Sequence, residues 1–214
     1  MNNNIADIRK EYKLQTLNET EVQPTAILQF HKWWNEALMS EIEEVNAMTL
    51  ATSTVSGKPS ARIVLLKGFD ESGFVFFTNY QSHKGMELAE NPFASLVFFW
   101  KELERQVRIE GAVERTTSNE SDLYFHSRPV ESRIGAWASP QSKVIPSRDV
   151  IEENVKELQK SFAGKEIDRP PHWGGYIVIP AVIEFWQGRP GRLHDRIRYT
   201  KQKDGSWKIE RLAP

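Results

Sequence analysis

From residue 47 onward the chain is a succession of short β-rich runs separated by turn signals, and this pattern most constrains its fold. β-Branched and aromatic residues dominate the runs, as is typical of strands. Turns rich in glycine, proline and serine separate them, for example at residues 55–59 and 70–73. We expect about seven strands. The candidates are eight runs, at residues 47–54, 60–69, 74–78, 94–100, 104–114, 176–186, 196–201 and 207–212.

Helical patterns are inserted before and between these strands. One helix is predicted to open at Pro24 and Thr25, with an apolar stripe formed by Ile27, Phe30, Trp34, Leu38 and Ile42. Others are predicted over residues 84–90 and 119–128, and from a Ser147 N-cap to Gly164. Because the βαβ order of parallel sheets is absent, we predict a mainly β fold: an antiparallel, Greek-key-like barrel with peripheral helices.

The polar residues 1–24 are predicted to form a flexible arm, and residues 25–214 a single domain. The arm does not have the pattern of a secretory signal, and no run approaches the length of a membrane span, so we expect a cytoplasmic protein. With no cysteine in its 214 residues, the chain has no disulfide, thiolate nucleophile or cysteine-ligated metal. The five histidines show no metal-ligand spacing, so no metal is expected.

The net charge of −1 disfavours a broad nucleic-acid surface, but arginines gather locally, which indicates a small anionic ligand. No glycine-rich phosphate loop is present, so side-chain cations must hold such a ligand. The first candidates are Arg62 and Lys67. On a regular strand they project to opposite faces, toward two anions or toward one anion and solvent. Alternatively, both lie at exposed strand ends.

The second candidate group is Tyr124, Arg128 and Ser132, two hydroxyls and a guanidinium that could clamp a phosphate. A helix C-terminus is a poor place for an anion, however, and an arginine there is also ordinary compensation of the helix dipole.

The third group is Arg192, His194 and Arg196, which share one face if the chain is extended there. The neighbouring positive charges are expected to keep the imidazole neutral near pH 7, which suits anion binding beside a proton-handling group. A structural histidine is the alternative. Nearby, Trp186 is expected either to pack on a planar cofactor ring or to belong to the core.

Taken together, these motifs resemble the pyridoxine (pyridoxamine) 5′-phosphate oxidase family, in order and spacing, from about residue 5 to the C-terminus. The matching stretches are 62–67 (RIVLLK), 103–107 (LERQV), 124–129 (YFHSRP), 134–142 (IGAWASPQS), 173–175 (WGG), 183–188 (IEFWQG), 192–196 (RLHDR) and 210–214 (ERLAP).

The resemblance implies an FMN-binding split barrel that forms a homodimer, with FMN at the interface held by both chains. The residues it implies for FMN are Arg62, Ile63, Lys67, Phe77, Thr78, His83, Lys84, Gln106, Gln141, Ser142, Trp186 and Arg196. Those it implies for the substrate are Arg9, Tyr12, Lys67, Tyr124, Arg128, Ser132, Arg192 and His194, with the arm as a lid. Arg192 and His194 are the expected catalytic residues.

The implied reaction belongs to vitamin B6 metabolism. Pyridoxamine 5′-phosphate and pyridoxine 5′-phosphate are converted to pyridoxal 5′-phosphate, with dioxygen as electron acceptor and hydrogen peroxide as product. His83 stands where the family often has arginine, which predicts weaker FMN phosphate binding at high pH, and Phe77 replaces a more usual tyrosine. The alternatives are a related split-barrel flavin oxidase with another substrate, such as a phenazine, or a non-catalytic flavin or pyridoxal phosphate binding module.

Overall fold

The computed structural model describes Ile5 and residues 10–214. These residues form two compact units, each assembled from separate stretches of the chain. Unit 1 consists of the described residues up to Thr49, together with Ser95–Glu110 and Pro180–Pro214, and unit 2 of Leu50–Ala94 and Gly111–Ile179. In this described part of the chain, no helix is both long and apolar enough to cross a membrane.

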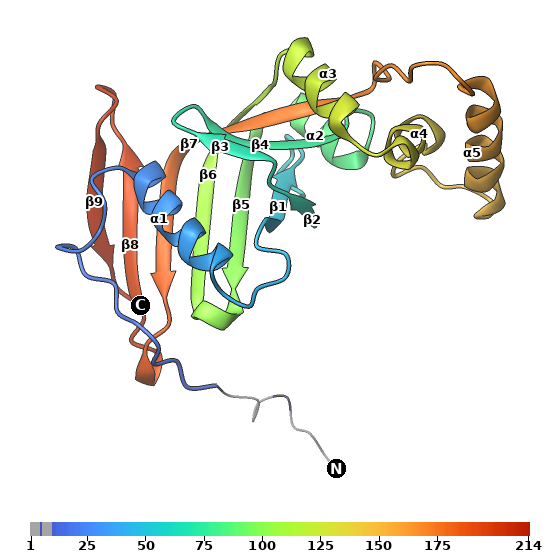
Figure 1. Ribbon diagram of the computed structural model, residues 1–214. Coiled ribbons are helices and arrows are strands. Elements are labelled where there is room, and N and C mark those ends of the chain that lie inside the picture. Colours follow the sequence, from blue (N-terminus) through green and yellow to red (C-terminus); the bar gives the residue numbers. More distant parts are fainter. Residues whose placement is uncertain (1–4, 6–9) are drawn as a thin grey trace. The chain divides into compact units, whose positions relative to one another are not determined.

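Nine strands form one sheet among the described residues, more than the sequence predicted. Along its main path the order is β2-β1-β5-β6-β7-β4-β3, and β8 pairs with β7 and β9 (Figure 1). β4 pairs antiparallel with β3 and β7, and β8 antiparallel with β7 and β9. The strands are β1 (Ala47–Ser53), β2 (Pro59–Leu65), β3 (Gly68–Asp70), β4 (Gly73–Asn79), β5 (Phe93–Trp100), β6 (Arg105–Arg115), β7 (Trp173–Gln187), β8 (Asp195–Lys201) and β9 (Trp207–Leu212).

The strand predicted over residues 60–69 is interrupted. β2 ends at Leu65, and β3 starts only at Gly68. Between them Leu66 is buried, and the Lys67 N–H donates to the Val75 carbonyl at 2.8 Å. The prediction that Arg62 and Lys67 project to opposite faces was therefore wrong, because strand alternation does not continue from one to the other.

Five α-helices are found in the same described residues: α1 (Ala26–Leu38), α2 (His83–Glu90), α3 (Ser118–Ser127), α4 (Val130–Ala138) and α5 (Asp149–Ser161). α1 begins where predicted, and Thr25 caps it, its side chain accepting from the Leu28 N–H. The helix ends before Ile42, however, and Leu38 is 57% exposed. Trp33 rather than Trp34 lies on the buried face, together with Ile27, Phe30 and Ala37.

Aromatic side chains fill the core of unit 1. Phe30 of α1 meets Phe98 of β5 with ring centroids 5.3 Å apart, and Trp33 meets Phe185 of β7 edge-on at 5.2 Å. The indole N–H of the buried Trp100 donates to the Val45 carbonyl at 3.1 Å. Burial of these large rings is what holds α1 on the strands.

In unit 2, α3 begins with a capping box between Thr117 and Glu120. The sequence did not predict α4, which follows α3 directly after Pro129 and lies beside α5 (Figure 1). The predicted Ser147 N-cap was wrong: the cap position of α5 is Arg148, and the Ser147 hydroxyl instead donates to Asp149. The buried cluster beneath these helices consists of Phe125, Ile134, Ile167 and Trp173.

Candidate functional site

A cavity of about 550 Å³ in unit 2, here called the cation pocket, brings together residues from β2, β4, α2, α3 and α4. Ten residues predicted to bind FMN or the substrate line it: Arg62, Ile63, Lys67, Phe77, Thr78, Lys84, Tyr124, Arg128, Ser132 and Gln141. Val64, Leu65, Asn79, Pro129 and Trp173 also line it, and sequence reasoning gave them no role.

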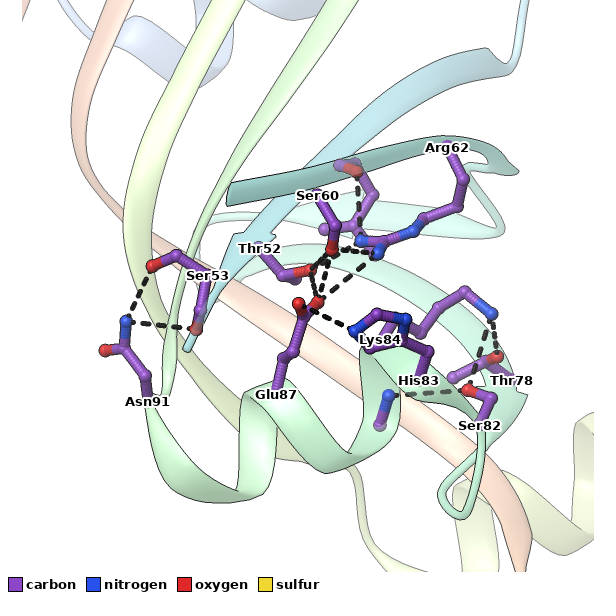
Figure 2. Close-up of polar contacts among 12 residues, drawn as sticks. Thr52, Ser53, Ser60, Arg62, Thr78, Ser82, His83, Lys84, Glu87 and Asn91 are labelled. Carbon is purple, nitrogen blue, oxygen red and sulfur yellow. Dashed lines mark hydrogen bonds and ion pairs between the residues drawn. The ribbon is translucent and has the colours of Figure 1, made fainter. Parts of the chain in front are cut away.

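Lys84 lies in the first turn of α2, behind the Ser82 N-cap (Figure 2). Its ammonium nitrogen is 3.2 Å from Thr78 Oγ1, 3.4 Å from Ser82 Oγ and 3.5 Å from Gln141 Oε1. All three acceptors are uncharged. Burial lowers the pKa of Lys84, and the nearby Arg62 lowers it further. An anion in the pocket would offset both effects.

Arg62 is committed to a network of protein acceptors (Figure 2). Its Nη1 donates to the Leu50 carbonyl at 3.3 Å and to Thr52 Oγ1 at 2.5 Å. Its Nη2 donates to Ser60 Oγ at 2.5 Å and to Glu87 Oε2 at 3.3 Å. These four bonds match the four hydrogens on the terminal nitrogens, so only Nε–H remains for a ligand.

Glu87 of α2 is the acidic centre of this network and was not singled out from the sequence. Its side chain is 4% exposed, and its Oε2 accepts from the Thr52 and Ser60 hydroxyls at 2.5 Å each. Burial alone would raise the pKa of Glu87, but these hydrogen bonds hold it below its ordinary value. Arg62 therefore faces a buried carboxylate, and its charge is largely neutralised.

His83 is an exposed partner of Glu87 in this network and does not line the cation pocket. Its Nε2 lies 3.1 Å from Glu87 Oε1, and its side chain is 62% exposed (Figure 2). The spacing of four residues on one helix is the sequence signal that could have paired them. The predicted influence of His83 on FMN stays a prediction.

Arg128 of the cation pocket has no acidic partner among the described residues. Its guanidinium lies over the Trp173 ring at 4.6 Å from the centroid, and its Nη1 is buried without a hydrogen-bond partner. Burial lowers its pKa. Trp173 lies 45 positions further along the chain, so no local sequence signal could have joined the two residues.

A helix C-terminus disfavours an anion, but the structure places the start of a second helix beside Arg128. Arg128 caps the C-terminus of α3, but α4 starts two residues later and places Ser132 in its first turn. The unpaired N–H groups of a helix start favour an anion. The Tyr124 and Phe77 rings stack beside this point at 4.0 Å, and the Lys67 ammonium lies 5.9 Å from the Tyr124 centroid.

A second cavity of about 630 Å³ lies in unit 1 and is here called the arm pocket. Its lining consists of Lys10, Glu11, Tyr12, Arg189, Gly191, Arg192 and His194. Trp186 does not line it but packs on the His194 ring, with centroids 4.6 Å apart. Three predicted residues, Tyr12, Arg192 and His194, thus meet here.

The prediction that Arg192, His194 and Arg196 share one strand face was wrong. Residues Pro190–Arg192 form a 3₁₀ turn, Arg192 has φ 62°, and β8 begins only at Asp195. Arg196 points elsewhere and makes two hydrogen bonds to the buried Glu184, at 2.9 and 3.1 Å. That bidentate contact raises the pKa of Arg196 and uses much of its donor capacity.

His194 is kept neutral, as the sequence predicted, but the main cause is burial rather than the neighbouring positive charge. Burial lowers its pKa below 6.5, and the positive charge of Arg192 adds to the effect. Its Nδ1 accepts from the Arg189 N–H at 3.1 Å, so the neutral ring carries its hydrogen on Nε2.

Three further predicted residues, Trp186, Gln106 and Ser142, lie outside both linings. Trp186 has been placed above. Gln106 is half-buried in β6, and Ser142 is exposed with φ 69°. Arg9 lies outside the described residues. Within the described part of the chain, no cluster of three or more acidic or histidine side chains could hold a metal ion.

Comparison with known proteins accounts for almost the whole chain. A family model described as pyridoxamine 5′-phosphate oxidase matches residues 35–162, and one described as the pyridoxine 5′-phosphate oxidase C-terminal dimerisation region matches residues 173–214. The chain belongs to the pyridoxine/pyridoxamine 5′-phosphate oxidase family. It is therefore an enzyme, an oxidoreductase, as the sequence predicted.

Curated relatives of that name match over all or nearly all of their length. The protein from Nostoc sp. is 60% identical over 214 residues, 100% of both chains. The protein from Cupriavidus necator is 55% identical over 210 residues, 98% of this chain and 99% of its own.

Solved structures confirm the predicted fold class. PhzG from Burkholderia lata, in complex with tetrahydrophenazine-1-carboxylic acid, has a TM-score of 0.88 at 29% identity and covers 96% of this chain and 100% of its own. A pyridoxamine 5′-phosphate oxidase-related, FMN binding protein from Nostoc punctiforme has a TM-score of 0.70 at 17% identity, over 86% and 97%. The fold is mainly β, with inserted helices, in the split-barrel class.

Proposed function

We propose that this enzyme oxidises pyridoxamine 5′-phosphate and pyridoxine 5′-phosphate to pyridoxal 5′-phosphate, with FMN as cofactor, dioxygen as electron acceptor and hydrogen peroxide as product. The observation that carries the proposal is the charge of the cation pocket. Its lining holds Arg62, Lys67, Lys84 and Arg128 but no carboxylate, and among the described residues only Arg62 is paired with an acid. Such a site fits phosphate groups. Relatives at 55–60% identity carry the corresponding name.

The residues of the cation pocket fit FMN. Lys84 offers a cation that meets only neutral oxygens, while Ile63, Leu65 and Phe77 offer apolar surface to a planar ring. Arg62 would contribute its remaining Nε–H, and Gln141 and Thr78 their polar groups. When bound, FMN would supply the hydride acceptor and then pass electrons to dioxygen.

For the substrate, Arg128 and Ser132 offer a guanidinium and a hydroxyl at the start of α4, with Tyr124 and Lys67 beside them. We assign these four residues to the substrate phosphate. Arg192 and His194 would orient the substrate for hydride transfer. Because His194 Nδ1 is engaged with the Arg189 N–H, its Nε2–H would donate to a substrate oxygen or nitrogen.

We further propose a homodimer with FMN at the interface, held by both chains. The description of residues 173–214 as a dimerisation region supports this assembly. The predicted cytoplasmic location stays a prediction.

The proposal is tested by purifying the protein and reducing it without oxygen. We expect a yellow protein whose flavin absorbance bleaches on anaerobic addition of pyridoxamine 5′-phosphate. Admission of air should restore the colour and release hydrogen peroxide. A protein that stays colourless after incubation with FMN would contradict the proposal, and one that binds FMN and pyridoxal phosphate without turnover would be a binding module instead.

The similarity to PhzG makes a phenazine-type substrate the second candidate. Arg128 distinguishes the two. With Arg128→Met, the KM for pyridoxamine 5′-phosphate should rise by about 10- to 100-fold, because a charged hydrogen bond to phosphate is lost. Arg148→Met, at an exposed arginine before α5, is the control and should leave KM unchanged. An unchanged KM in Arg128→Met would favour a substrate without phosphate.

A further inference from the structure

Glu104 is a buried carboxylate of unit 1 that the proposed reaction does not use. It lies between the 3₁₀ turn Lys101–Leu103 and β6, and its side chain is 2% exposed. Its φ of 55° is in the left-handed region, which a residue other than glycine adopts at some cost. A buried charge in such a backbone position needs strong compensating contacts.

Among the described residues, the donors that compensate this charge come from one short stretch of the N-terminal arm. Glu104 Oε2 accepts from the backbone N–H groups of Lys13 at 2.8 Å and Leu14 at 3.1 Å. Its Oε1 lies 3.3 Å from the Lys10 ammonium. Burial alone would raise the pKa of Glu104, but these three contacts hold it below its ordinary value, so the carboxylate is ionised at neutral pH.

In the sequence, Tyr12 lies between Lys10 and Lys13, both of which bind the Glu104 carboxylate. Its ring meets Trp186 edge-on at 5.7 Å and His194 at 5.9 Å, and it lines the arm pocket with Arg192. Among the described residues the carboxylate is bonded to Lys10, Lys13 and Leu14 and not to Tyr12, so the position of Tyr12 follows from that of its neighbours.

Gly188, directly after β7, packs closely against both Glu104 and Tyr12. The Gly188 N–H donates to the Glu104 carbonyl at 2.7 Å, which ties Glu104 to the end of β7. A Cβ on Gly188 would lie 2.7 Å from Cβ and Cγ of Tyr12 and 3.1 Å from Cβ of Glu104. Glu104 thus joins the arm to the end of β7, which carries Trp186, and Gly188, Tyr12 and Glu104 are in close contact there.

We propose that Glu104 is a positioning residue: its carboxylate seats residues 10–14 so that Tyr12 forms one wall of the arm pocket beside His194 and Arg192. A loosened arm would leave the pocket open to solvent and would weaken retention of its ligand. The identity of that ligand, a phosphorylated pyridine, rests on the proposed function, but the seating of the arm does not.

The first test follows the arm directly in the full-length protein, by amide hydrogen exchange at Lys13 and Leu14. Glu104→Gln keeps the size of the side chain and removes its charge. We expect exchange at both amides to accelerate about tenfold, since a charge-assisted hydrogen bond is lost. Glu102→Gln removes an exposed carboxylate two positions away and is the control, with unchanged exchange. Unchanged exchange in Glu104→Gln would overturn the proposal.

The second test separates positioning from a purely structural role. In Glu104→Gln the KM for pyridoxamine 5′-phosphate should rise severalfold while kcat changes by less than about twofold. Tyr12→Ala should raise KM as well, and the double variant should show no further increase, because both changes act through the same wall.

Two results of the kinetic test would contradict the proposal. A KM that does not change in Glu104→Gln would show that the contact between Glu104 and residues 10–14 has no role in ligand binding. Fully additive effects of the two substitutions on KM would show that Glu104 does not act through Tyr12. If the wild-type protein does not oxidise pyridoxamine 5′-phosphate at all, the proposed function fails, and the exchange measurement still decides the role of Glu104.

Discussion

Arginines that look equivalent in the sequence have different capacities to bind a ligand. Arg196 is bound by Glu184, and Arg62 is bound by Glu87 and three neutral oxygens. Arg128 rests on an aromatic ring, with one buried nitrogen lacking a partner. The energetic benefit of an incoming phosphate is therefore largest at Arg128, where no desolvated protein partner has to be replaced.

His194 is predicted to titrate below 6.5 in the folded protein, because burial and then Arg192 disfavour its charged form. An NMR titration of the histidine ring protons should show this, with His194→Gln identifying the resonance. Arg192→Met should raise the pKa of His194 but leave it below 6.5, because burial is the larger cause. A pKa at or above 6.5 in the wild-type protein would contradict the assignment.

The same depressed pKa fixes the sign of its contribution to stability. Between the pKa of folded His194 and 6.5, the unfolded chain binds a proton that the folded protein does not. The contribution of His194 to the free energy of unfolding is therefore fully present above 6.5 and decreases as the pH falls through this window.

At the scale of elements, α2 serves two purposes through neighbouring residues. Lys84 in its first turn faces the cation pocket, while Glu87 one turn later faces β1 and β2 (Figure 2). The helix is short, so its position depends on this buried network and on the Ser82 cap rather than on intrinsic helix stability.

Replacing Glu87 by alanine should lower the free energy of unfolding by about 1–3 kcal/mol, because Arg62 and two hydroxyls lose their shared acceptor. Its exposed partner in the same helix provides the matched control: His83→Ala should cost less than about 0.5 kcal/mol. Urea unfolding at neutral pH measures both. Equal losses in the two variants would show that the buried side of the network adds nothing.

At the scale of the whole molecule, a chain with a net charge of −1 concentrates unneutralised cations in one pocket. Such a pocket is unfavourable to the protein without a ligand, because like charges face one another across a partly desolvated space. Ligand binding and global stability are therefore expected to be coupled.

FMN should raise the thermal unfolding midpoint of the apoprotein in proportion to the logarithm of its concentration. Binding to the folded state alone contributes about 2.7 kcal/mol at a hundredfold excess over Kd. Riboflavin, which lacks the phosphate, should stabilise much less at the same concentration. Equal stabilisation by both ligands would place the cations of this pocket outside the phosphate site.

Local chemistry determined much of the fold and named most of the candidate site. β-Rich runs between turn signals located most strands, the Pro24–Thr25 start located the beginning of α1, and the antiparallel class followed from the absence of βαβ order. Each of these signals acts within a few residues, which is why sequence alone could resolve it. Family resemblance added further lining residues, among them Ile63, Phe77, Thr78, Lys84 and Gln141.

Only the tertiary structure decided how those residues are used. The break after Leu65 brought Lys67 into the pocket of Arg62, and the turn at Arg192 separated that residue from Arg196. Glu104 meets Lys13 over 91 positions of sequence. Contacts between residues so far apart depend on how strands and turns pack, and no periodicity within a segment carries that information.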